Sequence, residues 1–284
     1  MLALAENLLT TSAFTDAEVE TLEAAFLQQE QADCPVTHHF GPGVYIREVV
    51  LPTGAYVIGH RHKASHVNIM LEGRITLFNQ DGTRTELTAP QTFVGGAGRK
   101  IAYIHETVRW QNVYATDETD VETLEAQILD KSVVSEEFHK ANRLMLAHSC
   151  NADHEDFAAA IAEYELDPGT VWSMSLDETD QIPLPHGSYK MLVADSLIHG
   201  KGVFASDNIA QYELIAPARL GGKRTPAGRY TNHSAAPNAV MLMDNHGDIY
   251  LFASQSILGS KGGSVGQEIT IDYRQALALS AGDS

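Results

Sequence analysis

Residues 54–73 read GAYVIGHRHKASHVNIMLEG and place three histidines in a run of β-forming residues. Alternate residues of an extended strand point to the same face of a sheet. His60, His62 and His66 therefore share one face if this run is a single strand. Imidazoles gathered inside a small β-barrel are a usual way of holding a divalent transition metal. The alternative is a polar, water-filled pocket or a surface cluster of histidines.

The sequence on both sides of this stretch predicts short strands. From Val44 to about Val113, short alternating or apolar runs are punctuated by Pro and Gly, a pattern typical of a β-sandwich or barrel. Asp81-Gly82 predicts a hairpin turn, because both residues tolerate positive φ. Upstream, residues 15–31 predict an amphipathic helix, with Thr15 as its N-cap.

The histidine stretch resembles the first motif of the cupin family. The required spacings are met, and His66 stands where the family has an acidic ligand; the matching positions are Gly54, His60, His62 and Gly73. The second motif, expected over 88–103, departs from the family at Thr92 and Gly95, and His105 is a substitute ligand or a solvent-facing residue. Over residues 30–130 the sequence resembles cupin-type proteins of tailed bacteriophages.

This resemblance implies an N-terminal jelly-roll barrel, also called a double-stranded β-helix. It further implies a divalent transition metal bound by His60, His62 and His66. A metal-dependent oxygenase would need open coordination positions on the metal and a substrate pocket, neither of which is visible in sequence.

Three ordered motifs mark the C-terminal part of the chain. They are GKGVFA at 200–205, GRYTNHSAAPNA at 228–239 and GQEITIDY at 266–273. A Gly-x-Gly turn alone is usually no more than a turn. In this order, however, the three motifs resemble the SET-domain lysine methyltransferases, which implies a C-terminal β-rich SET fold and S-adenosylmethionine as cofactor.

The same resemblance implies roles for single residues. Ser234, Pro237 and Asn238 would belong to a chain crossing that brings this segment beside the C-terminal motif. Tyr273 would be the catalytic tyrosine, and Tyr230 a second aromatic wall of the lysine channel. The cofactor would be bound by Gly200, Lys201, Gly202, Asn232 and His233.

These residue types suit methyl transfer to an amine, which needs alignment and an apolar channel more than acid–base assistance. Aromatic faces attract cationic groups and exclude water. The stretch between Gly202 and Tyr230 is shorter than is usual in the family. A minimal substrate groove is therefore expected, or one completed by another subunit or by the rest of the chain.

Composition narrows the partners. The chain has 284 residues, with 19 Lys+Arg against 37 Asp+Glu and a formal charge of −18, which disfavours nucleic acid and anionic membranes. A lysine-bearing basic peptide suits this charge, and a homodimer or an assembly partner is compatible with it. Cys34 and Cys150 indicate neither a disulfide framework nor a Cys-built zinc site. No apolar run reaches a membrane span, and the start MLALAENLLT does not read as a signal peptide.

The expected architecture is mainly β with helical connectors, in five parts. These are 1–40, a helix and lead-in; 41–130, the cupin-like barrel; 131–186, a helical connector and acidic linker; 187–276, the SET domain; and 277–284, a tail. The expected function is that of an S-adenosylmethionine-dependent protein-lysine N-methyltransferase with an accessory cupin, encoded by a phage and acting in the host cytoplasm. The alternative is a non-catalytic assembly protein, associated with a virion, that keeps both folds.

Overall fold

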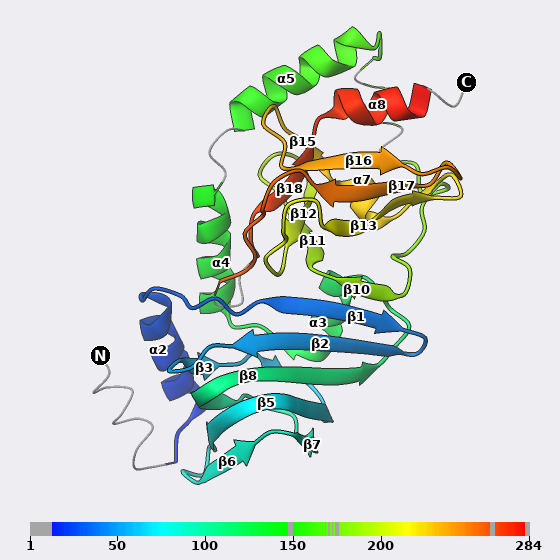
Figure 1. The fold of residues 1–284 in the computed structure, drawn as a ribbon. Helices are drawn as coiled ribbons and strands as arrows, with labels where there is room; N and C mark the ends of the chain where they lie inside the picture. Colours follow the sequence, from blue (N-terminus) through cyan, green and yellow to red (C-terminus); the bar gives the residue numbers. More distant parts are fainter. Residues whose placement is uncertain are drawn as a thin grey trace. The chain divides into compact units, whose positions relative to one another are not determined.

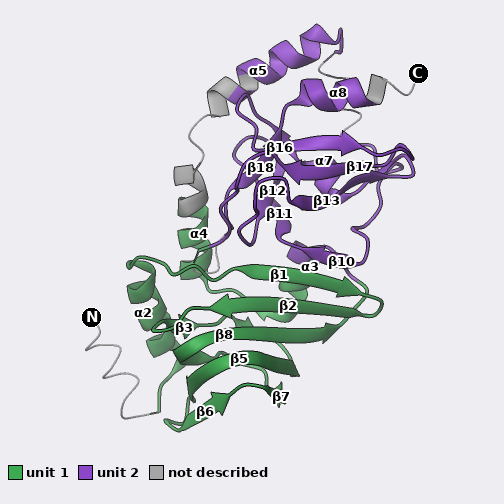
Figure 2. Ribbon diagram, in the orientation of Figure 1, with its two compact units in different colours: residues 1–117, 123–142, 261–264 green, residues 118–122, 143–260, 265–284 purple. Residues whose placement is uncertain are grey.

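The structure, a computed structural model, describes residues 13–146, 150–167, 176–261 and 265–281, with 169, 171 and 173 (Figure 1). The chain divides into two compact units, each made of separate segments (Figure 2). The first comprises residues 1–117, 123–142 and 261–264; the second comprises 118–122, 143–260 and 265–284. Strands dominate both units, as predicted. Among the described helices, none is long and apolar enough to cross a membrane.

The first unit begins with the predicted helix, α2 (Asp16–Leu27). Thr15 caps it, and the Thr15 and Glu18 side chains each bond the other's backbone N–H in a capping box. Val19 and Leu22 are buried and pack against Ile101 of the sheet. The helix ends four residues before the predicted limit, at Leu27.

The sheet of the first unit is antiparallel, with strand order β1–β2–β8–β5–β6, while β3 pairs with β8 and β7 with β5. The two-residue strands β4 and β9 pair with each other. This order is open, so the strand pairing does not show the closed barrel that the cupin resemblance implies. The strand bounds are β1 (Val36–Gly41), β2 (Val44–Leu51), β3 (Tyr56–Ile58), β4 (Arg61–His62), β5 (His66–Phe78), β6 (Arg84–Thr88), β7 (Gln91–Gly95), β8 (Ile101–Ala115) and β9 (Leu129–Asp130).

The predicted hairpin is present between β5 and β6, but its turn differs from the prediction. Phe78 pairs with Arg84, so the loop is longer than two residues. Gly82 alone of the pair has positive φ, at 83°. The Asp81 carboxylate instead accepts bonds from the backbone N–H and the hydroxyl of Thr83. Asp81 thus shapes the loop through its side chain, as aspartate often does in turns.

Helices α4 (Val133–Leu146) and α5 (Cys150–Glu163) lie in the stretch 131–186, where a helical connector was predicted, whereas α3 (Val121–Ile128) lies in the stretch assigned to the barrel. They do not form one connector, because α5 belongs to the second unit (Figure 2).

The second unit holds two four-stranded sheets, ordered β11–β12–β18–β15 and β14–β13–β17–β16. All strand pairs in them are antiparallel except β15 with β18, which is parallel. The element bounds are β10 (Gly187–Tyr189), β11 (Met191–Asp195), β12 (Lys201–Ala205), β13 (Leu214–Leu220), β14 (Lys223–Arg224), α7 (Pro226–Tyr230), β15 (Asn232–His233), β16 (Ala239–Met243), β17 (Ile249–Ala253), β18 (Glu268–Ile271) and α8 (Tyr273–Ala281).

Candidate functional site

The parallel pair of β15 and β18 brings the second and third C-terminal motifs together. Asn232 lies opposite Thr270, and His233 opposite Ile271. Asn238 extends the contact, because its side chain donates to the Glu268 carbonyl at 2.8 Å and accepts from the Thr270 N–H at 2.9 Å. The predicted juxtaposition of these segments is confirmed.

Asn232 joins the first motif to the other two. Its amide nitrogen lies 3.0 Å from the Lys201 carbonyl, 3.3 Å from the His199 carbonyl and 2.8 Å from Glu268 Oε1. The two amide hydrogens are therefore engaged within the protein, which leaves the amide oxygen as the Asn232 atom available to a ligand.

Glu268 lies beneath the Gly-Lys-Gly turn. Burial raises the pKa of its carboxyl group, against the opposing effect of hydrogen bonds from Asn232 and Ser196. A Cβ on Gly202 would lie 2.3 Å from Glu268 Oε1. Gly202 is therefore needed to admit this carboxylate. Gly200 differs, because its φ is +50° and space is open where a Cβ would stand.

Lys201 begins β12, and its side chain makes two ion pairs inside the second unit. Its ammonium lies 2.6 Å from Glu122 and 3.1 Å from Asp195. The Lys201 ammonium is thus engaged within the unit, and the expected cofactor role of Lys201 could fall only to its backbone.

Tyr273 is held at both its backbone and its hydroxyl. Its N–H donates to His233 Nδ1 at 3.1 Å, and its hydroxyl donates to the Thr231 carbonyl at 3.1 Å. Its ring meets His233 and Phe157 edge to face, with centroids 5.3 and 5.7 Å away. Burial raises the pKa of Tyr273 to about 12. The hydroxyl is therefore neutral near pH 7 and acts as a hydrogen-bonding group.

His233 positions Tyr273. Because Nδ1 accepts from Tyr273, Nε2 carries the proton donated to Asp156 Oδ2, 3.0 Å away. The side chain is only 3% exposed. Both ring nitrogens are engaged internally, so only the His233 backbone is available for the cofactor role expected of this residue.

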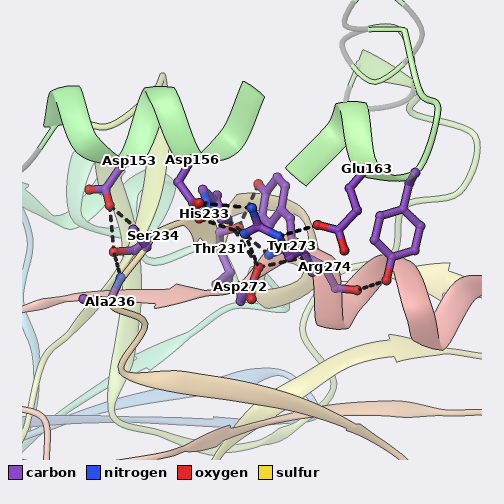
Figure 3. A network of polar contacts seen from close by, with 12 residues as sticks. Asp153, Asp156, Glu163, Thr231, His233, Ser234, Ala236, Asp272, Tyr273 and Arg274 are labelled. Atoms are coloured by element: carbon purple, nitrogen blue, oxygen red, sulfur yellow. Dashed lines mark hydrogen bonds and ion pairs between the residues drawn. The ribbon is translucent and has the colours of Figure 1, made fainter. Parts of the chain in front are cut away.

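Helix α5 supplies partners that sequence reasoning assigned to a connector (Figure 3). Asp153 accepts from the Ser234 hydroxyl at 2.9 Å and the Ala235 N–H at 3.0 Å. Asp156 forms a two-pronged ion pair with Arg274, which holds the pKa of Asp156 below its usual value. Residues three and seven apart share one helix face. The spacing of Asp153, Asp156 and Glu163 places three acidic residues on one face of the helix, and could have predicted that this face contacts another segment.

Tyr230 ends α7, and the Arg229 guanidinium lies over its ring at 5.1 Å. Among the described residues, the ring contacts of Tyr273 are with Phe157 and His233. The structure thus offers Phe157 and His233 as aromatic neighbours of Tyr273, in the place that the sequence reasoning gave to Tyr230.

In the first unit, the expectation that His60, His62 and His66 lie on one strand is wrong. Strand β4 ends at His62, a bend follows, and β5 begins at His66. Alternation along a single strand therefore does not govern their orientation.

The three histidines also have separate environments. The rings of His62 and His66 stack with centroids 4.2 Å apart. His62 Nδ1 lies 2.9 Å from the Tyr114 hydroxyl, and His66 Nε2 lies 3.1 Å from the Asn112 amide nitrogen. Burial lowers the pKa of both His60 and His62 to about 3.

These donors do not fit the expected metal. Among the described residues, no three His, Cys, Asp or Glu side chains converge as a metal-binding group. His105 does not complete one either, because its Nε2 lies 2.7 Å from the Thr76 hydroxyl. Stacked rings present their faces to each other, whereas metal ligands must aim nitrogen lone pairs at one point.

Comparison with known proteins found no matching family model and no matching curated protein. Solved structures do show likenesses. One is an HTH_3 family transcriptional regulator from Vibrio cholerae, with 16% identity over 36% of this chain and 64% of that chain, slightly under two thirds of its length, at a TM-score of 0.26.

Two others are cupin proteins. A cupin-2 domain protein from Shewanella frigidimarina has 14% identity over 34% of this chain and 92% of that chain, at a TM-score of 0.25. An RmlC-like cupin from Methanocaldococcus jannaschii, described as a double-stranded β-helix, has 17% identity over 32% of this chain and 86% of that chain, at a TM-score of 0.26.

Proposed function

We propose that the second unit is an S-adenosylmethionine-dependent protein-lysine N-methyltransferase. The observation that carries this proposal is the convergence of three distant segments at Asn232, whose amide bonds His199 in the turn before β12, Lys201 at the start of β12, and Glu268 at the start of β18. Tyr273 follows directly, with its hydroxyl fixed on Thr231. The accessory cupin and the phage origin rest on the sequence resemblance alone.

The described residues fit the cofactor in part. The Gly200 backbone faces open space, and the amide oxygen of Asn232 is suited to accept from an ammonium group. Gly200, Lys201, Asn232 and His233 would hold the cofactor, mostly through backbone groups. When bound, S-adenosylmethionine supplies an electrophilic methyl group on a sulfonium.

The protein's own contribution is alignment and desolvation. The ring of Tyr273, with Phe157 and His233 at its edges, forms an aromatic surface that suits a cationic group. The Tyr273 hydroxyl stays protonated and orients through Thr231. The formal charge of −18 favours encounter with a basic, lysine-bearing peptide.

Calorimetric titration of the full chain with S-adenosylmethionine tests the proposal. Saturable binding by the wild type is expected, and Asn232→Ala should lose it, because the turn before β12 is released. Asn245→Ala, at an exposed asparagine of the same unit, is the matched control. Tyr273→Phe should still bind the cofactor but lose methyl transfer to lysine-containing peptides.

Absence of cofactor binding by the folded wild type would overturn this proposal. The internal bonding of Asn232 and His233 would then favour the alternative, a non-catalytic assembly protein in which these side chains serve the fold.

A further inference from the structure

The first unit has a cavity of about 450 Å³, open on one side, beside its sheet and helix α2. Its walls are mainly apolar, with Val57, Leu77 and Trp110 among them. This volume falls within the roughly 300–1,000 Å³ of small-molecule sites, which are apolar pockets with a few fixed polar groups.

Three polar groups of this cavity are buried without hydrogen-bond partners. Lys100 Nζ, His60 Nδ1 and Arg47 Nε have none among the residues that the structure describes, and all three residues line the cavity. Arg47 has a counter-charge, because its Nε lies 4.0 Å from Glu125. Buried polar groups are nearly always satisfied, so unsatisfied groups gathered in one cavity point to a missing ligand or ordered water.

The charge balance selects the kind of ligand. Burial lowers the pKa of Lys100, and no nearby carboxylate acts to raise it again. Neither carboxylate of the lining pairs with Lys100. Glu23 accepts hydrogen bonds from Arg99 and Ser132, and Glu30 is exposed to solvent. A buried ammonium without a counter-charge is costly, and a carboxylate ligand would offset that cost.

We propose that this cavity binds an apolar monocarboxylate, with the carboxylate on the Lys100 ammonium and His60 Nδ1, and the apolar body against Trp110. This site is separate from the methyltransferase proposed for the second unit. The proposed site needs no metal. It gives a role to Lys100, which was not among the expected metal ligands.

Octanoate and its neutral isostere octanamide test the proposal on the full chain. The protein has two tryptophans, so a Trp172→Phe background leaves Trp110 as the fluorescent reporter of the cavity. Calorimetry gives an independent affinity. Octanoate should bind saturably and at least about tenfold more tightly than octanamide, since hydrogen bonds to charged groups are the stronger ones. Acetate, which lacks the apolar body, should bind far more weakly.

Lys100→Met should remove most of the preference for octanoate over octanamide. Lys140→Met, at an exposed lysine of the same unit, should preserve it. Equal affinity of the wild type for the two compounds would overturn the proposal, as would failure of millimolar octanoate to bind. Both of these outcomes are read on the wild-type side chain at position 100, so they stand even if Lys100→Met does not fold.

Discussion

At the scale of single residues, buried histidines make the first unit sensitive to acid. His38 is 1% exposed, and its Nδ1 lies 2.8 Å from the Tyr45 hydroxyl. Burial lowers the pKa of His38 to about 3 from an ordinary value of 6.5. Between these values the unfolded chain binds the proton and the folded protein does not, so stability falls as the pH falls from 6.5 toward 3.

We expect His38→Gln to flatten this decline by up to about 1.4 kcal/mol per pH unit, because it removes one such group. Unfolding followed by Trp110 fluorescence from pH 7 to pH 4 measures the slope. His105→Gln, at a half-buried histidine of β8, is the control in the same unit. An unchanged slope in His38→Gln would mean that His38 is protonated in the folded protein.

The residues nameable from sequence were those carried by local motifs. The segments of Asn232 and Tyr273 lie together, through the pairing of β15 with β18 and the bond from Tyr273 to His233, while the roles of the two residues stay predictions. The role of the His233 side chain could not be read, since its partner Asp156 lies 77 positions away. Spacing along a strand also failed for His60 and His66, because a bend of a few residues resets which way a side chain points.

At the scale of elements, Gly73 sets the irregularity within the long strand β5. The register with β8 shifts between Glu72 and Arg74, and Gly73 has a φ of +91°. A Cβ there would lie 2.3 Å from the Thr107 carbonyl oxygen. We expect Gly73→Ala to destabilise the unit by about 1–3 kcal/mol, through strain and backbone displacement.

Chemical denaturation measures this change. Gly96→Ala is the control, because a Cβ at Gly96 meets nothing within 4 Å. Equal midpoints for the two variants would show that the β5 irregularity accommodates a side chain.

Buried Asp153 is one of the residues that hold helix α5 to the rest of the second unit. Asp153→Ala would leave the Ser234 hydroxyl and the Ala235 N–H without their acceptor. The expected loss is about 1–3 kcal/mol in unfolding free energy, the usual cost of an unsatisfied buried group. Glu155→Ala, on the exposed side of the same helix, should stay within about 0.5 kcal/mol of the wild type. Hydrogen exchange of the α5 amides should rise in Asp153→Ala only.

At the scale of the whole molecule, the chain order and the units do not coincide. The high strand content of both halves was predictable, because strands are indicated by local residue patterns. The division was not, since both units are discontinuous in the chain: residues 118–122 belong to the second unit and residues 261–264 to the first. The acidic, turn-rich stretch before residue 187 marks a change in residue composition. Such a change does not indicate which unit a neighbouring helix belongs to.

This division decides which fragment can fold. A fragment starting at residue 187 loses α5, with its bonds to Ser234 and Arg274, and also Asp180, which pairs with Arg224 at 2.6 Å. We expect residues 187–284 to remain unfolded and residues 143–284 to give dispersed amide resonances. Near-ultraviolet circular dichroism and two-dimensional NMR of both fragments decide the matter. If the shorter fragment has equally dispersed amide resonances and equal stability, α5 is not needed for the second unit to fold.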